Sequence, residues 1–150
     1  MINRKGRKTD RTVVMENIIY KYFADQYNIL LEHEHRLQNG CIPDFYKEII
    51  ENGKKQDSLI IEIKQSISDF YSGFGLNFIG SSNYIAVPSD LVGFTINFIE
   101  TDKKNQTNVG IIEVTATGLV RIVRYPRWGF FTPYHLLQKR GKINVSIHNR

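Results

Sequence analysis

The chain has 150 residues, of which 41% are hydrophobic and 23% charged, with one cysteine and a net charge of +5. These values indicate one soluble globular domain with a core of its own. They exclude an intramolecular disulfide, and no apolar run approaches the roughly 18 residues of a membrane span. No apolar stretch follows the basic N-terminus as a signal peptide requires, so we expect a cytoplasmic protein without a membrane segment.

The charge is distributed unevenly along the chain. Residues 1–11 carry five Lys or Arg and one acid (+4), residues 12–120 carry a net charge of −6, and residues 121–150 carry seven Lys or Arg and no acid (+7). An acidic centre suits a cation and basic ends suit a polyanion such as DNA, although basic ends can also serve solubility alone. We therefore predict a flexible basic arm (1–11), a central domain (12–124) and a basic extension (125–150) packed on that domain.

The basic ends supply the candidates for contact with DNA. Such side chains bind phosphates and position a duplex, but they do not read its sequence. The candidate residues are Arg4, Lys5, Arg7, Lys8, Arg124, Arg127, Lys139, Arg140 and Lys142.

In chain order, apolar residues at helical spacing predict a first helix from near Val13 to about Tyr27, capped by Asp10 or Thr12. Residues 28–38 read as a strand with His33 and His35 on one face, followed by a turn at 39–40. Two histidines on one face could bind zinc, but no third ligand stands nearby in the sequence. A solvated strand face is the better interpretation.

The next two predicted strands form a hairpin. The first runs from about Cys41 to Ile50, with Pro43 at a start, bend or bulge that re-aims Asp44. The turn covers 51–55, and residues 58–65 form the second strand.

The rest of the chain predicts a helix at 66–72, a strand at 84–87, a helix at 91–99, a hairpin at 110–124 and a last helix at 134–140. The resulting order α-β-β-β-α-β-α-β-β indicates an α/β sandwich on a central mixed sheet.

Two carboxylates stand out in the predicted hairpin. Alternation along the strand puts Glu62 and Lys64 on one face, and pairing of the strands would place Asp44 beside Glu62. Opposed positions lie about 4.5–5.5 Å apart at Cβ, which lets two carboxylates share a magnesium ion with oxygens at about 2.0–2.1 Å. The alternative is a buried salt-bridge cluster, but such clusters rarely add stability over apolar packing.

Pro43-Asp44 followed by Glu62-x-Lys64 resembles the signature of the PD-(D/E)XK nuclease superfamily. Three wider stretches, 62–70, 83–88 and 110–123, are similar to bacterial MmcB-type DNA-repair proteins and related phage nucleases. The likeness covers roughly residues 13–124. It implies a restriction-endonuclease-like α/β/α sandwich.

The resemblance also implies roles for single residues. Asp44, Glu62 and the backbone carbonyl of Ile63 would bind Mg²⁺, with Mn²⁺ as a substitute. Lys64 would orient the attacking water or offset charge on the phosphate. A glutamate from the first helix often joins the metal in this superfamily, and Glu16 is the candidate here, with Asp25 as the alternative. Gln65 and Ser66 could hydrogen-bond to the metal-binding side chains, although Ser66 could equally only cap its helix.

The expected function is metal-dependent cleavage of DNA in repair, recombination or phage DNA processing. A non-catalytic DNA-binding or partner-docking protein on the same fold is the main alternative, and a restriction-type defence nuclease is a weaker one. Cutting both strands of a duplex usually needs two active sites, so a homodimer stays an open possibility.

Overall fold

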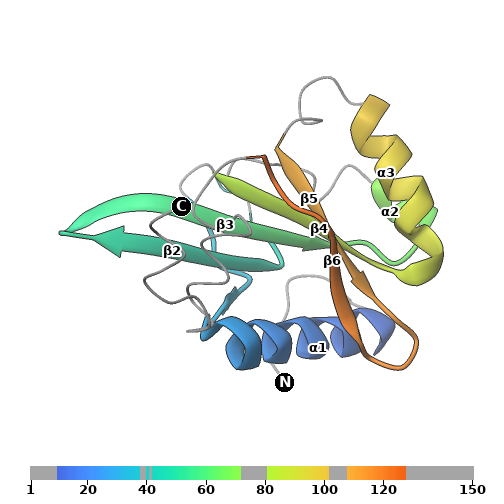
Figure 1. Ribbon diagram of the computed structural model, residues 1–150, viewed down its shortest axis with the longest axis horizontal. Helices are drawn as coiled ribbons and strands as arrows, with labels where there is room; N and C mark the ends of the chain where they lie inside the picture. The colour runs from blue at the N-terminus through green and yellow to red at the C-terminus, as the bar shows by residue number, and fades with distance from the viewer. Residues whose placement is uncertain (1–9, 38–39, 41, 72–80, 102–107, 128–150) are drawn as a thin grey trace, which may run out of the picture.

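A computed structural model describes residues 10–37, 40, 42–71, 81–101 and 108–127 of the chain, and it has one six-stranded mixed sheet flanked by helices (Figure 1). The order of elements agrees with the order predicted from the sequence. The helices are α1 (Asp10–Tyr27), α2 (Ile67–Phe70), the 3-10 turn η1 (Ser89–Leu91) and α3 (Val92–Thr101). The strands are β1 (Glu32–His33), β2 (Phe45–Glu51), β3 (Lys54–Ile63), β4 (Ser82–Pro88), β5 (Val109–Val114) and β6 (Val120–Arg124).

The six strands lie side by side in chain order. The pairs β1–β2, β2–β3 and β5–β6 are antiparallel, whereas β3–β4 and β4–β5 are parallel. Parallel neighbours need a crossover, and the segments that contain α2 and α3 provide the two crossovers. The middle of the sheet is therefore parallel and its two edges are hairpins.

Each face of the sheet has its own hydrophobic cluster. Helix α1 packs against one face, where Leu59, Ile61 and Ile63 of β3 are buried. The other face is covered by α2 and α3, against Ile85 and Val87 of β4 (Figure 1). The predicted apolar face of β3 is thus confirmed, and Glu62, which alternates with these residues, faces away from α1.

The structure corrects two predictions between residues 10 and 38. Helix α1 begins at Asp10 instead of near Val13. The strand predicted at 28–38 is reduced to two residues, because Asn28 and Glu34 have positive φ angles of 55° and 53° that interrupt an extended backbone.

Pro43 precedes β2, which starts at Phe45 instead of about Cys41. The register shift in this hairpin lies at Ile49/Ile50, so no bulge re-aims Asp44. The turn into β3 is confirmed, with φ angles of 54° at Asn52 and 76° at Gly53. Asn39 and Cys41 lie outside the described residues.

After β3 the predicted elements are present with small shifts. Helix α2 has four residues and ends at Phe70, short of the predicted Ser72, and β5–β6 form the predicted hairpin. A Cβ atom on Gly110 would lie 2.6 Å from the Arg124 carbonyl oxygen and 2.7 Å from the Tyr84 ring, so β5 needs glycine where Tyr84 packs over it. The predicted helix at 134–140 falls outside the described residues.

Candidate active site

Asp44 and Glu62 meet where β2 begins and β3 ends. Phe45 pairs with Ile61, and one further step along this antiparallel register sets Asp44 opposite Glu62. The Ile63 N–H donates to Oδ2 of Asp44 at 2.7 Å, and the Asp44 N–H approaches Oε1 of Glu62 at 3.4 Å. The sequence-based prediction that these two carboxylates come together is therefore matched by the geometry.

The environment of Glu62 disfavours its negative charge. The residue is only 4% exposed, and burial raises its pKa well above the ordinary value. The charge of Asp44 raises the pKa further, and the nearby Lys64 ammonium lowers it in part.

Lys64 is itself buried, and its backbone N–H donates to the Ala86 carbonyl at 2.9 Å. Two carboxylates therefore stand beside one ammonium in a poorly solvated place. A bound divalent cation would relieve the excess negative charge, and carboxylate oxygens are the donors that Mg²⁺ prefers. The residues present fit such an ion.

The segment that follows Lys64 turns directly into α2. Ser66 caps this helix, since its Oγ accepts from the Asp69 N–H at 3.3 Å. The Gln65 N–H donates to Oδ2 of Asp69 at 3.0 Å. The capping role of Ser66 is confirmed, and hydrogen bonds from Gln65 or Ser66 to the carboxylates of the site stay a prediction.

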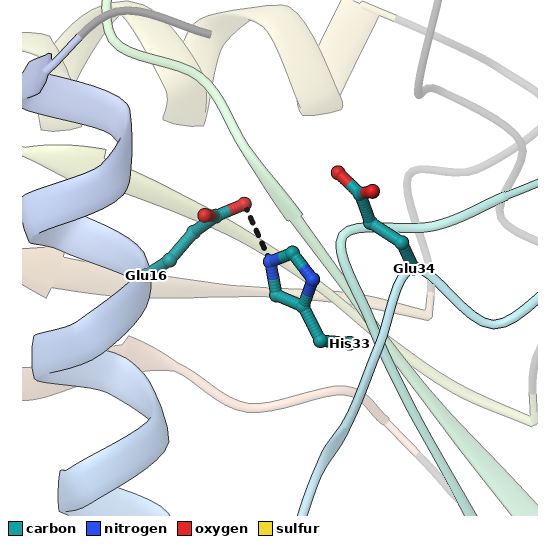
Figure 2. Close-up of side chains that lie close together, drawn as sticks. All are labelled: Glu16, His33 and Glu34. Carbon is teal, nitrogen blue, oxygen red and sulfur yellow. Dashed lines mark ion pairs between the residues drawn. The ribbon is translucent and has the colours of Figure 1, made fainter. Parts of the chain in front are cut away.

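Glu16 lies buried on α1, with its Oε2 3.1 Å from Nε2 of His33. Figure 2 shows the His33 imidazole between Glu16 and Glu34. Asp25, the alternative to Glu16, is about half exposed and pairs with Lys21 at 2.6 Å. Whether Glu16 or Asp25 contributes a ligand to the Asp44–Glu62 pair stays a prediction.

The prediction of a solvated face for His33 and His35 is wrong for His33, whose side chain is 8% exposed. His35 is 43% exposed, lies 3.0 Å from Glu32 and stacks on Tyr46. The sequence analysis did not place Glu16 beside His33 and Glu34. Glu16 comes from α1, far away in the sequence, and no local spacing indicates that contact.

The basic candidates are only partly covered by the structure. Arg124 on β6 is 30% exposed and lies 3.9 Å from Glu100, and Arg127 is exposed. The remaining candidates, Arg4, Lys5, Arg7, Lys8, Lys139, Arg140 and Lys142, lie outside the described residues. Contact of these residues with DNA stays a prediction.

No family model matches the chain, and neither does any curated protein or solved structure. Within the described ranges, no helix is both long and apolar enough to cross a membrane. We therefore infer the function from the site itself.

Proposed function

We propose that this chain is a divalent-metal-dependent DNA endonuclease of the PD-(D/E)XK type on a restriction-endonuclease-like α/β/α sandwich. One observation carries the proposal: Asp44 and Glu62, from adjacent strands, bring their carboxylates together beside Lys64 in a buried place. The order of elements and the mixed sheet support the fold. A buried group of this composition with a perturbed carboxyl pKa is typical of a functional site.

Asp44 and Glu62 would hold Mg²⁺, with the Ile63 carbonyl as a third oxygen and Mn²⁺ as a substitute. When bound, the ion supplies Lewis acidity and acidifies a water near the phosphodiester. The Ile63 N–H orients the Asp44 carboxylate through its hydrogen bond of 2.7 Å. Participation of Glu16 stays a prediction.

Lys64 acts as a fixed positive charge in this proposal. Its ammonium is close enough to Glu62 to lower the pKa of that carboxyl. At the end of β3, the same charge can orient an attacking water or offset the negative charge that grows on the phosphate. Lys64 is not required as a general base in this proposal, because a metal-bound water can supply the nucleophile.

The substrate would be held by the basic ends of the chain. Their charges of +4 and +7 suit binding to DNA phosphates without sequence reading. Repair, recombination and phage DNA processing in the cytoplasm all fit such an enzyme. A homodimer would provide two sites for cutting a duplex.

The test is cleavage of supercoiled plasmid by the full chain with Mg²⁺ or Mn²⁺, with EDTA as the blank. Asp44→Asn and Lys64→Ala should each slow cleavage by about 10²-fold or more, because each removes a charged group from the reacting centre. Glu48→Gln is the matched control: this β2 carboxylate pairs with Lys55 and Tyr46 and should cleave like the parent.

Three results would change the assignment. Cleavage that persists in both Asp44→Asn and Lys64→Ala points to a contaminant and removes the proposal. Binding of DNA without cleavage, with either ion, identifies a non-catalytic DNA-binding protein. Discrete plasmid fragments identify a sequence-specific, restriction-type enzyme.

A further inference from the structure

We infer that Glu16, His33 and Glu34 form a second metal site, one that takes a divalent transition-metal ion in preference to Mg²⁺. The inference does not depend on the proposed nuclease activity. It starts from the geometry of the cluster: one possible donor atom from each of the three side chains lies within 4.8 Å of the other two (Figure 2).

The state of His33 is the observation that points to a ligand. Its side chain is 92% buried, with an exposed fraction of 8%. In the part of the chain that the structure describes, neither of its ring nitrogens has a hydrogen-bond partner. Nε2 lies 3.1 Å from Oε2 of Glu16, but this close approach lacks the direction of a hydrogen bond. A buried ring nitrogen without a hydrogen bond is destabilising, and a metal–nitrogen bond would offset this cost.

The surroundings of His33 hold the imidazole toward the two carboxylates. Its ring packs edge-on against Phe45, with centroids 5.3 Å apart. Glu16 reaches it from α1 and is only 1% exposed, while Glu34 follows directly after β1. The Glu34 N–H donates to the Asp44 carbonyl at 3.1 Å, which ties this segment to the start of β2. The three donors thus come from α1 and from the segment at the end of β1.

The spacing requires only a small closure. In a tetrahedral zinc site with bonds of about 2.1 Å, two donors lie about 3.4 Å apart. The donors here lie within 4.8 Å of one another, so side-chain rotations that bring each pair closer by at most about 1.4 Å complete the set. Three protein ligands leave a further position for water, as in open zinc sites.

The donor set also selects the ion. Imidazole nitrogen suits Zn²⁺, Fe²⁺ and other transition metals, whereas Mg²⁺ prefers oxygen ligands alone. The site at Asp44 and Glu62 offers oxygens, and the His33 cluster offers nitrogen and oxygen. One chain would then hold two kinds of ion at two separate places, with Glu16 bound to the ion at His33 and not to the ion at Asp44 and Glu62.

The experiment is a calorimetric titration of the full chain with Zn²⁺ and, separately, with Mn²⁺. His33→Ala should weaken Zn²⁺ binding by about 10–100-fold, and Glu34→Gln, at a half-buried position, should weaken it in the same direction. His35→Ala is the matched control, since that ring is exposed and stacks on Tyr46, and it should leave the affinity unchanged. An Asp44→Asn/Glu62→Gln double variant should keep this site, which separates it from failure of the nuclease proposal.

A second readout on the parent protein does not depend on the variants folding. Zn²⁺ should shift the ring ¹⁵N resonances of His33 and leave those of His35 in place, and a tenfold larger Mg²⁺ concentration should shift neither. A Zn²⁺ response at His35 with none at His33, or Zn²⁺ affinity equal in the parent and in both the His33 and Glu34 variants, overturns the inference.

Discussion

Glu62 on β3 and Glu113 on β5 are two buried carboxylates of one sheet, and their pKa values are shifted in opposite directions. Their exposed fractions are 4% and 9%. The pKa of Glu62 is raised, first by burial and then by the charge of Asp44. The pKa of Glu113 is lowered, first by a hydrogen bond from the Ser89 side chain and then by Arg121, whose Nε donates to Oε1 at 2.8 Å.

The difference shows which carboxylate has a complete set of partners within the protein. Glu113 sits directly across the strand pair from Arg121 and receives donors from two sides. Glu62 sits across from another carboxylate, and Lys64 compensates only part of the charge. A structural ion pair explains Glu113, whereas the negative charge of Glu62 is disfavoured by its surroundings, as is typical of a functional site.

The largest expected effect is on catalysis. Glu62→Gln keeps the shape of the side chain but removes a carboxylate that we propose as a metal ligand, so plasmid cleavage should slow by about 10²-fold or more. Glu113→Gln should keep cleavage within about threefold of the parent, because Glu113 lies two strands away from Glu62 and pairs with Arg121. Initial nicking rates with Mg²⁺ measure both. Equal losses of nicking rate in the two variants would contradict the different roles proposed for the two carboxylates.

The second effect is stabilisation by the ion. A ligand that binds only the folded state at 100 times its dissociation constant adds about 2.7 kcal/mol to the free energy of unfolding. Mn²⁺ should therefore raise the melting temperature of the parent and of Glu113→Gln. Asp44→Asn/Glu62→Gln should lose the part of the rise that this site provides. Thermal unfolding with and without EDTA measures it, and a full rise in the double variant would place the ion elsewhere.

The sequence was sufficient to predict the elements of the sheet because apolar residues repeat with clear periods. Alternation along β3 correctly separated Ile61 and Ile63 from Glu62. The register of the turn at Asn52-Gly53 alone would set Pro43 opposite Glu62, and the register shift at Ile49/Ile50 is what sets Asp44 there. The predicted meeting of Asp44 and Glu62 therefore depends on an irregularity in β2 that no local pattern indicated.

The rest depended on contacts between distant segments. Positive φ angles at Asn28 and Glu34 shorten β1, although neither residue is glycine and the sequence around them reads as extended. Burial of His33 requires α1 to cover β1, and the approach of Glu16 requires the same packing. The compensation of Glu113 by Ser89 joins β5 to η1 through tertiary structure. None of these contacts has a signature in local spacing.

A third, smaller effect should appear in the pH dependence of stability of the metal-free protein. The pKa of Glu62 is higher in the folded protein than its ordinary value of 4.5. The contribution of Glu62 to the free energy of unfolding is therefore fully present below pH 4.5, and it is lost as the pH rises through the pKa of the folded state. The lowered pKa of Glu113 has the opposite sign: its contribution is present above 4.5 and is lost as the pH falls.

Urea unfolding in EDTA at several values between pH 4 and pH 8 separates the two. Relative to the parent, Glu62→Gln should gain stability as the pH rises. Glu113→Gln should lose stability over the same range. If the stability relative to the parent changes with pH in the same direction in both variants, one of the two carboxylates has been assigned the wrong environment.

The smallest effect concerns the partner of Glu113. Arg121 is 69% exposed, so solvent screens its charge, and the pair should contribute only about 0.2–1 kcal/mol to the free energy of unfolding. A double-mutant cycle of Arg121→Gln and Glu113→Gln measures this coupling, which should fall in high salt because the charges are accessible to ions. A coupling of about 3 kcal/mol or more would mean that the pair behaves as fully buried. Burial alone would then fail to distinguish Glu113 from Glu62, and the distinction would depend only on whether the opposed residue carries a positive or a negative charge.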